Sequence, residues 1–183
     1  PAANRGGEPG KLTGGGSGAP ALPTRPVVDP AFDKGALGDT FTPGVHGRDV
    51  FKYEHERLTA HHLVKRYGWS VHGRAVATQD GVKNPDTMVR KDPHDPGTVT
   101  EFKHVEKASL NAIRRCLWKA GDQLAPWGGG DVVIDGRKAG LTEDTARQQV
   151  TQAVAESKRK GKALPSQIYV ILGDGSMITM RGV

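Results

Sequence analysis

Glycine and proline are concentrated at the beginning of this chain of 183 residues, and this confines a packed fold to the remainder. Residues 1–50 contain 11 of the 25 glycines and 7 of the 12 prolines. Such a segment buries too little apolar surface to offset the entropy lost on ordering it. We therefore predict a largely extended linker over residues 1–48 and one folded domain over residues 49–183. The chain begins with Pro1 rather than Met, so we expect it to be a piece of a longer protein.

Hydrophobic periodicity in the folded part predicts both helices and strands. Helices are expected at residues 49–68, with Asp49 as N-cap and Gly68 at the end, at 109–124, and at 141–161. Strands are expected at residues 69–77, 87–91, 97–105 and 131–135, and a final hairpin at 166–180. This order predicts an α/β (α+β) domain with a central mixed β-sheet flanked by helices.

The charge of the chain favours a polyanionic partner. Residues 1–50 carry five basic and five acidic side chains, so the whole net charge of +6 belongs to the rest. The single cysteine, Cys116, excludes an intrachain disulfide framework and a multi-cysteine zinc module, and we expect it in the core. No apolar run approaches the roughly 20 residues of a membrane-spanning helix, and the first residues lack the pattern of a signal peptide.

Two polar motifs flank a loop in the middle of the domain. They are "NPD" at 84–86 and "EFK" at 101–103. Because side chains alternate along a strand, Glu101 and Lys103 are predicted on one face and His104 on the other. The hairpin places Asp86 beside Glu101.

Two neighbouring carboxylates repel each other unless a proton or a cation lies between them. Mg²⁺ takes oxygen ligands from one or two carboxylates, so it is the simplest candidate, with Mn²⁺ or Zn²⁺ as alternatives. On the first predicted helix, Glu56 points toward the apolar face, whereas Glu54 and His55 point away from it. A carboxylate directed at the core needs a partner, and a metal site would supply one.

The motifs together resemble a known family over residues 51–182. "NPD" followed by "EFK", behind a helix that carries a glutamate, is similar to the split signature of the PD-(D/E)XK nuclease superfamily. The stretches "ERLTAHHLVKRYGWSV", "NPDTMV", "TEFKHV" and "AGDQLAPWGGGDVVID" resemble the C-terminal nuclease domains of bacterial polymorphic toxins. The likeness is greatest to the transfer-RNA-cleaving ends of contact-dependent growth inhibition proteins.

This resemblance implies roles for five residues. Glu56, Asp86 and Glu101 would bind the metal, Lys103 would be the catalytic lysine, and Gln123 would assist it from the following helix. The resemblance also implies cleavage of RNA, with tRNA favoured, and a cognate immunity protein that blocks the site. It implies a domain that is secreted or delivered as the C-terminal part of a larger bacterial toxin and acts in the cytoplasm of the target cell.

The loop between the two motifs departs from the family pattern. "RKDPHDPGT" is longer and more acidic than the tight hairpin usual there, and it adds Asp92 and Asp95 as rival carboxylates. Seven histidines also invite a catalytic interpretation, for which His72 and His104 are the candidates. The alternative for both is an ordinary surface or core histidine.

Basic and aromatic residues on the second predicted helix are candidates for nucleic-acid binding. They are Arg114, Arg115, Trp118 and Lys119, which would grip a phosphate backbone and stack a base, or else form a solvated helix face. Other functions stay open at this stage. They are a DNase toxin of the same fold, a nuclease of restriction or repair, and a non-enzymatic basic nucleic-acid-binding module whose acids form ion pairs.

Overall fold

One seven-stranded mixed sheet forms the centre of the domain. The computed structural model describes residues 40–47, 51–73 and 84–183. The strands are β1 (Gly44–His46), β2 (Ser70–Gly73), β3 (Thr87–Arg90), β4 (Thr98–His104), β5 (Asp131–Asp135), β6 (Gln167–Ile171) and β7 (Met177–Arg181). They lie side by side in chain order, and β1–β2, β4–β5 and β5–β6 are parallel while the other pairs are antiparallel.

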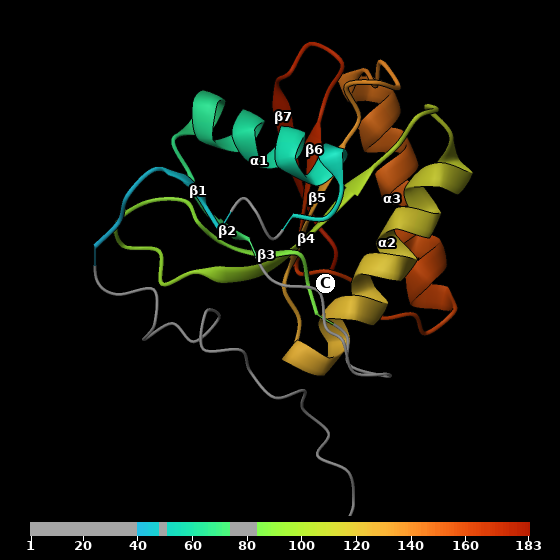
Figure 1. Cartoon of the computed structure of the whole chain (residues 1–183). Helices are drawn as coiled ribbons and strands as arrows, with labels where there is room; N and C mark the ends of the chain where they lie inside the picture. The colour runs from blue at the N-terminus through green and yellow to red at the C-terminus, as the bar shows by residue number, and fades with distance from the viewer. Residues whose placement is uncertain (1–39, 48–50, 74–83) are drawn as a thin grey trace, which may run out of the picture.

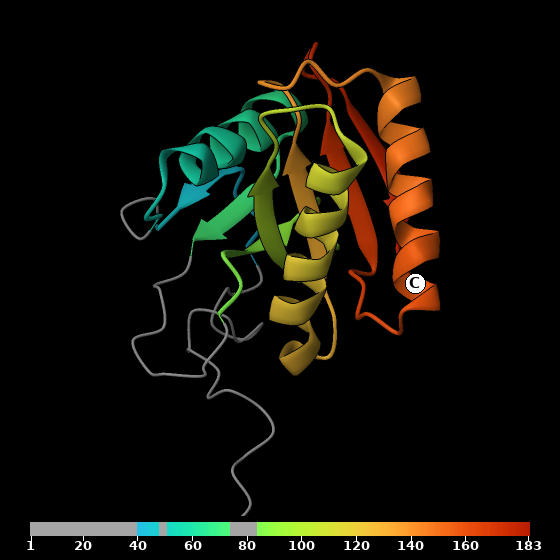
Figure 2. The same cartoon turned by 90° about the vertical axis from the view of Figure 1, so that its right-hand side faces the viewer.

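Helices cover both faces of this sheet. They are α1 (Glu54–Tyr67), α2 (Leu110–Leu124), the short 3₁₀ helix η3 (Ala125–Trp127) and α3 (Glu143–Arg159). Helix α1 lies on one face, and α2 and α3 lie on the other (Figures 1 and 2). The predicted α/β class with a central mixed sheet flanked by helices is therefore confirmed.

Strand alternation divides the core into two apolar clusters. In β5, Val132 and Ile134 pack with α2 and α3, whereas Val133 packs with α1 through residues such as Leu63. Phe102 of β4 is buried on the α1 side. The two clusters fix α1 and α2 on opposite faces of β4, the strand that carries the "EFK" motif.

Helix α1 begins later than the sequence indicates. It starts at Glu54 rather than near residue 49, and Asp49, the expected N-cap, lies outside the described residues. The Glu56 carboxylate instead accepts a hydrogen bond from the backbone N–H of Tyr53 at 3.3 Å. Phe51 is buried and stacks on Phe102, and the N-cap residue Tyr53 has an extended backbone. The helix does end as predicted, at Gly68 with φ of 67°.

The sheet begins earlier than the predicted domain boundary. β1 lies within residues 1–48, the predicted linker, and pairs in parallel with β2. The linker stays a prediction for residues 1–39, which the structure does not describe. The predicted strand 69–77 is described only as far as residue 73, where β2 ends. Within the described ranges, no helix has the length and apolar character needed to cross a membrane.

Candidate active site

The β3–β4 hairpin joins Asp86 and Glu101 at its open end. Thr87 pairs with Thr100, so the residues just outside this pair are neighbours. The backbone N–H of Asp86 donates to Glu101 Oε2 at 3.2 Å. The backbone N–H of Phe102 donates to Asp86 Oδ2 at 2.9 Å. Each carboxylate is thus held by the other strand, as the sequence predicts for this pair.

Lys103 connects the strand to α2. Its Nζ donates to Glu101 Oε1, and it also donates to Gln123 Oε1 at 2.9 Å. The Glu101 side chain is fully buried, whereas 18% of the Lys103 side chain is exposed. The predicted glutamine therefore orients the ammonium group without contributing a charge of its own.

These residues line a pocket of about 400 Å³ formed by the start of α1, the end of β4 and α2. It is lined by Tyr53, His55, Glu56, Asp86, Glu101, Phe102, Lys103, His104, Val105, Ala112, Arg115, Cys116, Lys119 and Gln123. All five predicted catalytic residues are in this set. The pocket lies where the end of β4 meets the first turn of α1 and one side of α2.

Two histidines belong to the pocket, and sequence reasoning misplaced one of them. His55 was expected to point away, yet it lines the pocket, and its ring centroid lies 3.9 Å from that of His104. The apolar face of α1 did not predict this contact because the first turn of the helix extends over the end of β4. His104 was expected on the opposite strand face, and it reaches the pocket because the cavity opens at the strand end.

The other candidate histidine, His72, is remote from the pocket. Its Nε2 lies 2.9 Å from Ser70 Oγ, and its ring stacks on His46 with a centroid distance of 4.5 Å. Burial, followed by the charge of His46, lowers the pKa of His72 to about 4. His72 therefore belongs to the β1–β2 edge of the sheet and has no contact with the carboxylates.

Burial makes the carboxylates of the pocket hard to ionise together. It raises the pKa of Asp86 to about 6. Burial and the neighbouring charge of Asp86 raise the pKa of Glu101 to about 7, against the opposing effect of Lys103. The pKa of Glu56 is also raised, first by burial. Carboxylates in this state readily take up a proton, or a cation in addition to the Lys103 ammonium group.

The donor set fits a divalent cation through its chemistry. Asp86 and Glu101 offer adjacent carboxylate oxygens, and one or two carboxylates are what Mg²⁺ usually takes from a protein. Glu56 lines the same pocket. In the conformation described, no group of three or more His, Cys, Asp or Glu side chains among the described residues is arranged to hold a metal ion. Binding through all three acids would therefore require Glu56 to move, and the metal stays a prediction.

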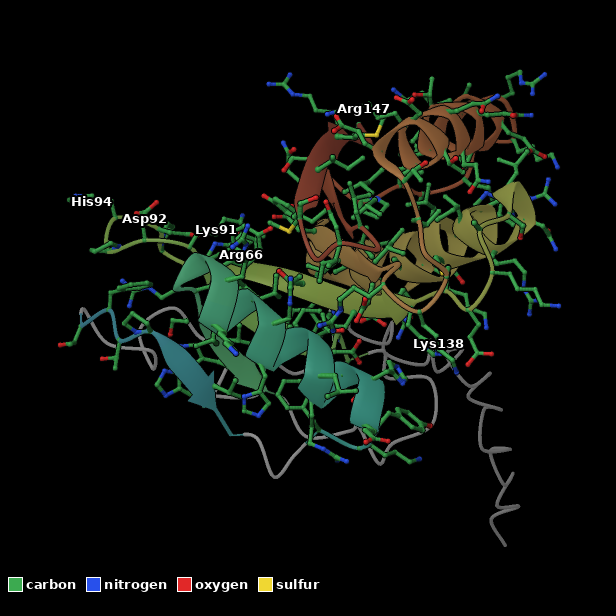
Figure 3. All side chains as sticks on the ribbon, turned by 90° about the horizontal axis from the view of Figure 1, so that it is seen from above. Arg66, Lys91, Asp92, His94, Lys138 and Arg147 are labelled. Carbon is green, nitrogen blue, oxygen red and sulfur yellow. The ribbon has the colours of Figure 1, made fainter. Side chains whose placement is uncertain are left out.

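The loop acids build the turn. Asp92 and Asp95 each accept hydrogen bonds from two backbone N–H groups of the same loop, at 2.8 to 3.0 Å. Figure 3 shows Asp92 and His94 at the outer end of this loop. The loop closes the hairpin at the end opposite to Asp86 and Glu101, so neither loop acid competes for the pocket.

Only two of the four predicted nucleic-acid-binding residues line the pocket. Arg115 and Lys119 do so. Arg114 instead forms an ion pair with Glu156 of α3, with Nη1 and Oε2 3.0 Å apart, and Trp118 also faces α3. Each residue of a helix is turned by about 100° from the previous one. Arg114 and Trp118 therefore face α3, while their neighbours Arg115 and Lys119 face the pocket.

The raised pKa of Glu101 predicts a pH-dependent stability. Its folded-state pKa lies above its ordinary value, so the protonated side chain favours the folded state. This contribution to stability is complete below about pH 4 and is lost as the pH rises through about 7. In EDTA, the wild-type protein and Glu101→Gln should have similar unfolding free energies at pH 5. At pH 8 the wild type should be less stable than Glu101→Gln by about 2 kcal/mol. Denaturant titration at both pH values measures this difference.

The comparison with Glu101→Gln is needed because His72, with a lowered pKa, changes stability in the opposite direction. Added Mg²⁺ at pH 8 should restore stability to the wild type and not to the variant. An equal pH dependence in the two proteins would contradict the assignment of the pKa shift to Glu101.

Comparisons with known proteins add a fold likeness. No family model matches the chain, and no curated protein matches it. Among solved structures, it is similar to a chain described as a CdiA-CT/CdiI toxin and immunity complex from Burkholderia pseudomallei. The sequence identity is 13%, the match covers 69% of this chain and 81% of that chain, and the TM-score is 0.44. A likeness of this size carries no argument about activity.

Proposed function

We propose that this domain is a metal-dependent endonuclease that hydrolyses phosphodiester bonds, with RNA as its substrate and tRNA favoured. The observation that carries the proposal is the hydrogen-bonded set of Asp86, Glu101 and Lys103 in the pocket. Two acids that resist joint ionisation, next to an ammonium group, suit a site for a divalent cation and a phosphate. An exposed ion pair would not be built this way, because Glu101 is fully buried.

In this proposal, Asp86 and Glu101 hold the cation, which is Mg²⁺ or another divalent metal such as Mn²⁺ or Zn²⁺, and Glu56 is a further carboxylate. Such a cation activates water and stabilises negative charge on a phosphate when bound. Lys103 places its ammonium group where charge develops on the phosphate oxygens. Gln123 keeps that group in place through its 2.9 Å hydrogen bond.

The rim of the pocket supports an anionic substrate. Arg115 and Lys119 line it from α2, together with Lys103 of β4. Phosphate contacts of this kind position a nucleic acid without reading its sequence. The net charge of +6 agrees with such a partner. RNA is preferred over DNA because of the sequence resemblance, since a metal-activated water does not require a 2′-hydroxyl group.

The biological setting rests on the same resemblance. We propose a toxin domain that is secreted or delivered as the C-terminal part of a larger bacterial protein and acts in the cytoplasm of the target cell. A cognate immunity protein would neutralise it, and the pocket with its basic rim is the surface that such a protein would cover. Co-expression with a neighbouring gene product should then restore growth to cells that express the domain.

Cleavage assays with two nucleic acids test the enzymatic proposal. The purified domain should cut bulk tRNA in Mg²⁺ and leave it intact in EDTA. Asp86→Asn should lower the rate by at least about 100-fold, because it removes one proposed carboxylate ligand. Electrophoresis of tRNA and of plasmid DNA under the same conditions measures both activities.

The same assay separates the alternatives. Intact RNA beside cut DNA would favour the DNase interpretation. Intact RNA and DNA at every metal tested would favour a non-enzymatic binding module. Cleavage without growth inhibition would favour a nuclease of restriction or repair.

A further inference from the structure

A second group of cations lies where α2 meets α3, outside the pocket. The cations surround the indole ring of Trp118. Arg114 Cζ is 5.3 Å from the ring centroid, Lys160 Nζ is 5.1 Å from it, and Lys162 Nζ is 5.5 Å from it. We call these four residues the α2–α3 basic cluster.

The cluster is held in place by buried contacts. Trp118 Nε1 donates to Ser157 Oγ at 2.8 Å, and Ser157 donates in turn to the carbonyl oxygen of Ala153 at 2.6 Å. These bonds fix the indole ring against α3. Cations held over a rigid aromatic ring can contact a phosphate with little ordering cost.

The charge of the cluster is only partly balanced. Glu156 contacts Arg114 at 3.0 Å and Lys160 at 2.9 Å. Three cations and one carboxylate leave an excess of two positive charges. Lys160 and Lys162 are exposed, so this excess faces solvent.

The cluster continues the rim of the pocket. Arg114 and Trp118 each precede a rim residue, Arg115 and Lys119, and one step along a helix turns the side chain by about 100°. The solvent-facing side of α2 therefore runs from the pocket to α3 with basic side chains at both borders. Asp122 is an exposed acid on this same side.

We propose that the α2–α3 basic cluster binds the phosphate backbone of the RNA strand beside the bond that is cleaved. This rests on the proposed function, because a strand whose phosphodiester occupies the pocket must leave it across a neighbouring surface. An acidic protein would also be attracted by the charge. A nucleic acid is favoured because the cluster continues the basic rim formed by Arg115 and Lys119, along which a strand would leave the pocket.

Binding without cleavage tests the proposal directly. In a Lys103→Ala background with EDTA, fluorescently labelled bulk tRNA is titrated against the parent and against Lys160→Ala/Lys162→Ala. We expect about tenfold weaker binding near 0.1 M salt. The slope of log K against log salt should also fall by about 1 to 2, since each lost phosphate contact removes about 0.7 to 0.9.

The matched control is Lys65→Ala/Arg66→Ala, which removes the same charge from exposed positions in the last turn of α1. Figure 3 labels Arg66. It should change both quantities by much less. Equal losses of tRNA affinity in the two double variants would mean that only the total charge matters, and this would overturn the proposal. Unchanged tRNA binding in Lys160→Ala/Lys162→Ala, or binding only of an acidic immunity protein at this surface, would also overturn it.

A turnover measurement separates this proposal from the proposed function. With Lys103 intact and Mg²⁺ present, Lys160→Ala/Lys162→Ala should raise KM for tRNA about tenfold and leave kcat unchanged. Hydrolysis of bis(4-nitrophenyl) phosphate, which is too small to reach the cluster, should be unaffected. If the wild type hydrolyses neither substrate, the proposed function fails, while the binding titration still decides whether the cluster contacts RNA.

Discussion

Replacing Lys103 by Ala should lower RNA cleavage by about three orders of magnitude, which is the effect of removing a preorganised charge from a transition state. Two consequences add together. The phosphate loses the ammonium group that Gln123 and Glu101 hold in place. Glu101, whose pKa is already raised by burial and by Asp86, also loses the cation that favours its ionised form. The variant should therefore turn over more slowly, and its Glu101 should hold a proton up to a higher pH.

Initial cleavage rates at saturating tRNA and Mg²⁺, measured at several pH values, separate these two consequences. Lys138→Ala is the control, since Lys138 is 73% exposed and forms a surface ion pair with Glu106. It should retain activity within about twofold, as expected for a surface pair. Thermal unfolding should confirm that Lys103→Ala is folded. More than a tenth of the wild-type rate in a folded Lys103→Ala protein would contradict the proposed role of the lysine.

The second large effect concerns Gly121 in α2. A Cβ atom at this position would lie 2.0 Å from the carbonyl oxygen of Ala163, in the connection that follows α3. The obstacle is backbone, so the connection itself has to move. We expect Gly121→Ala to cost about 3 kcal/mol from overpacking, with about 1 kcal/mol returned by the better helix propensity of alanine. Denaturant unfolding should show a net loss of about 2 kcal/mol or more.

Gly161→Ala is the matched control. Gly161 has a left-handed φ of 61°, and an added Cβ atom would meet no heavy atom within 4 Å. The substitution should therefore cost only about 1 kcal/mol of backbone strain. A loss in Gly161→Ala as large as that in Gly121→Ala would mean that backbone conformation, and not the close approach of α2, limits stability here.

The Gly121 contact also connects stability to the α2–α3 basic cluster. Ala163 directly follows Lys162, so the close approach of the backbone at Gly121 helps to set the position of that lysine. A reduction in tRNA affinity is therefore expected in Gly121→Ala, in addition to its lower stability. Lys160→Ala/Lys162→Ala is the sharper test of RNA binding, because both side chains are exposed and their loss should leave the core unchanged.

Much of the candidate site was predictable because local rules govern it. Strand alternation placed Glu101 and Lys103 on one face, and the hairpin register brought Asp86 to Glu101. Helical spacing directed Glu56 inward. The start of α1 was not predictable in this way, because the helix is capped at Tyr53 by the Glu56 carboxylate and preceded by Phe51, which is buried against Phe102.

The sequence by itself determined which side chains share a strand or helix face, since the periods of 2 and 3.6 residues are properties of the backbone. Only the tertiary structure decided what each face meets. It placed His55 over His104 and turned Arg114 and Trp118 toward α3, away from the pocket. These contacts join segments distant in the chain, and the packing of α1 and α2 on opposite faces of one sheet determines them.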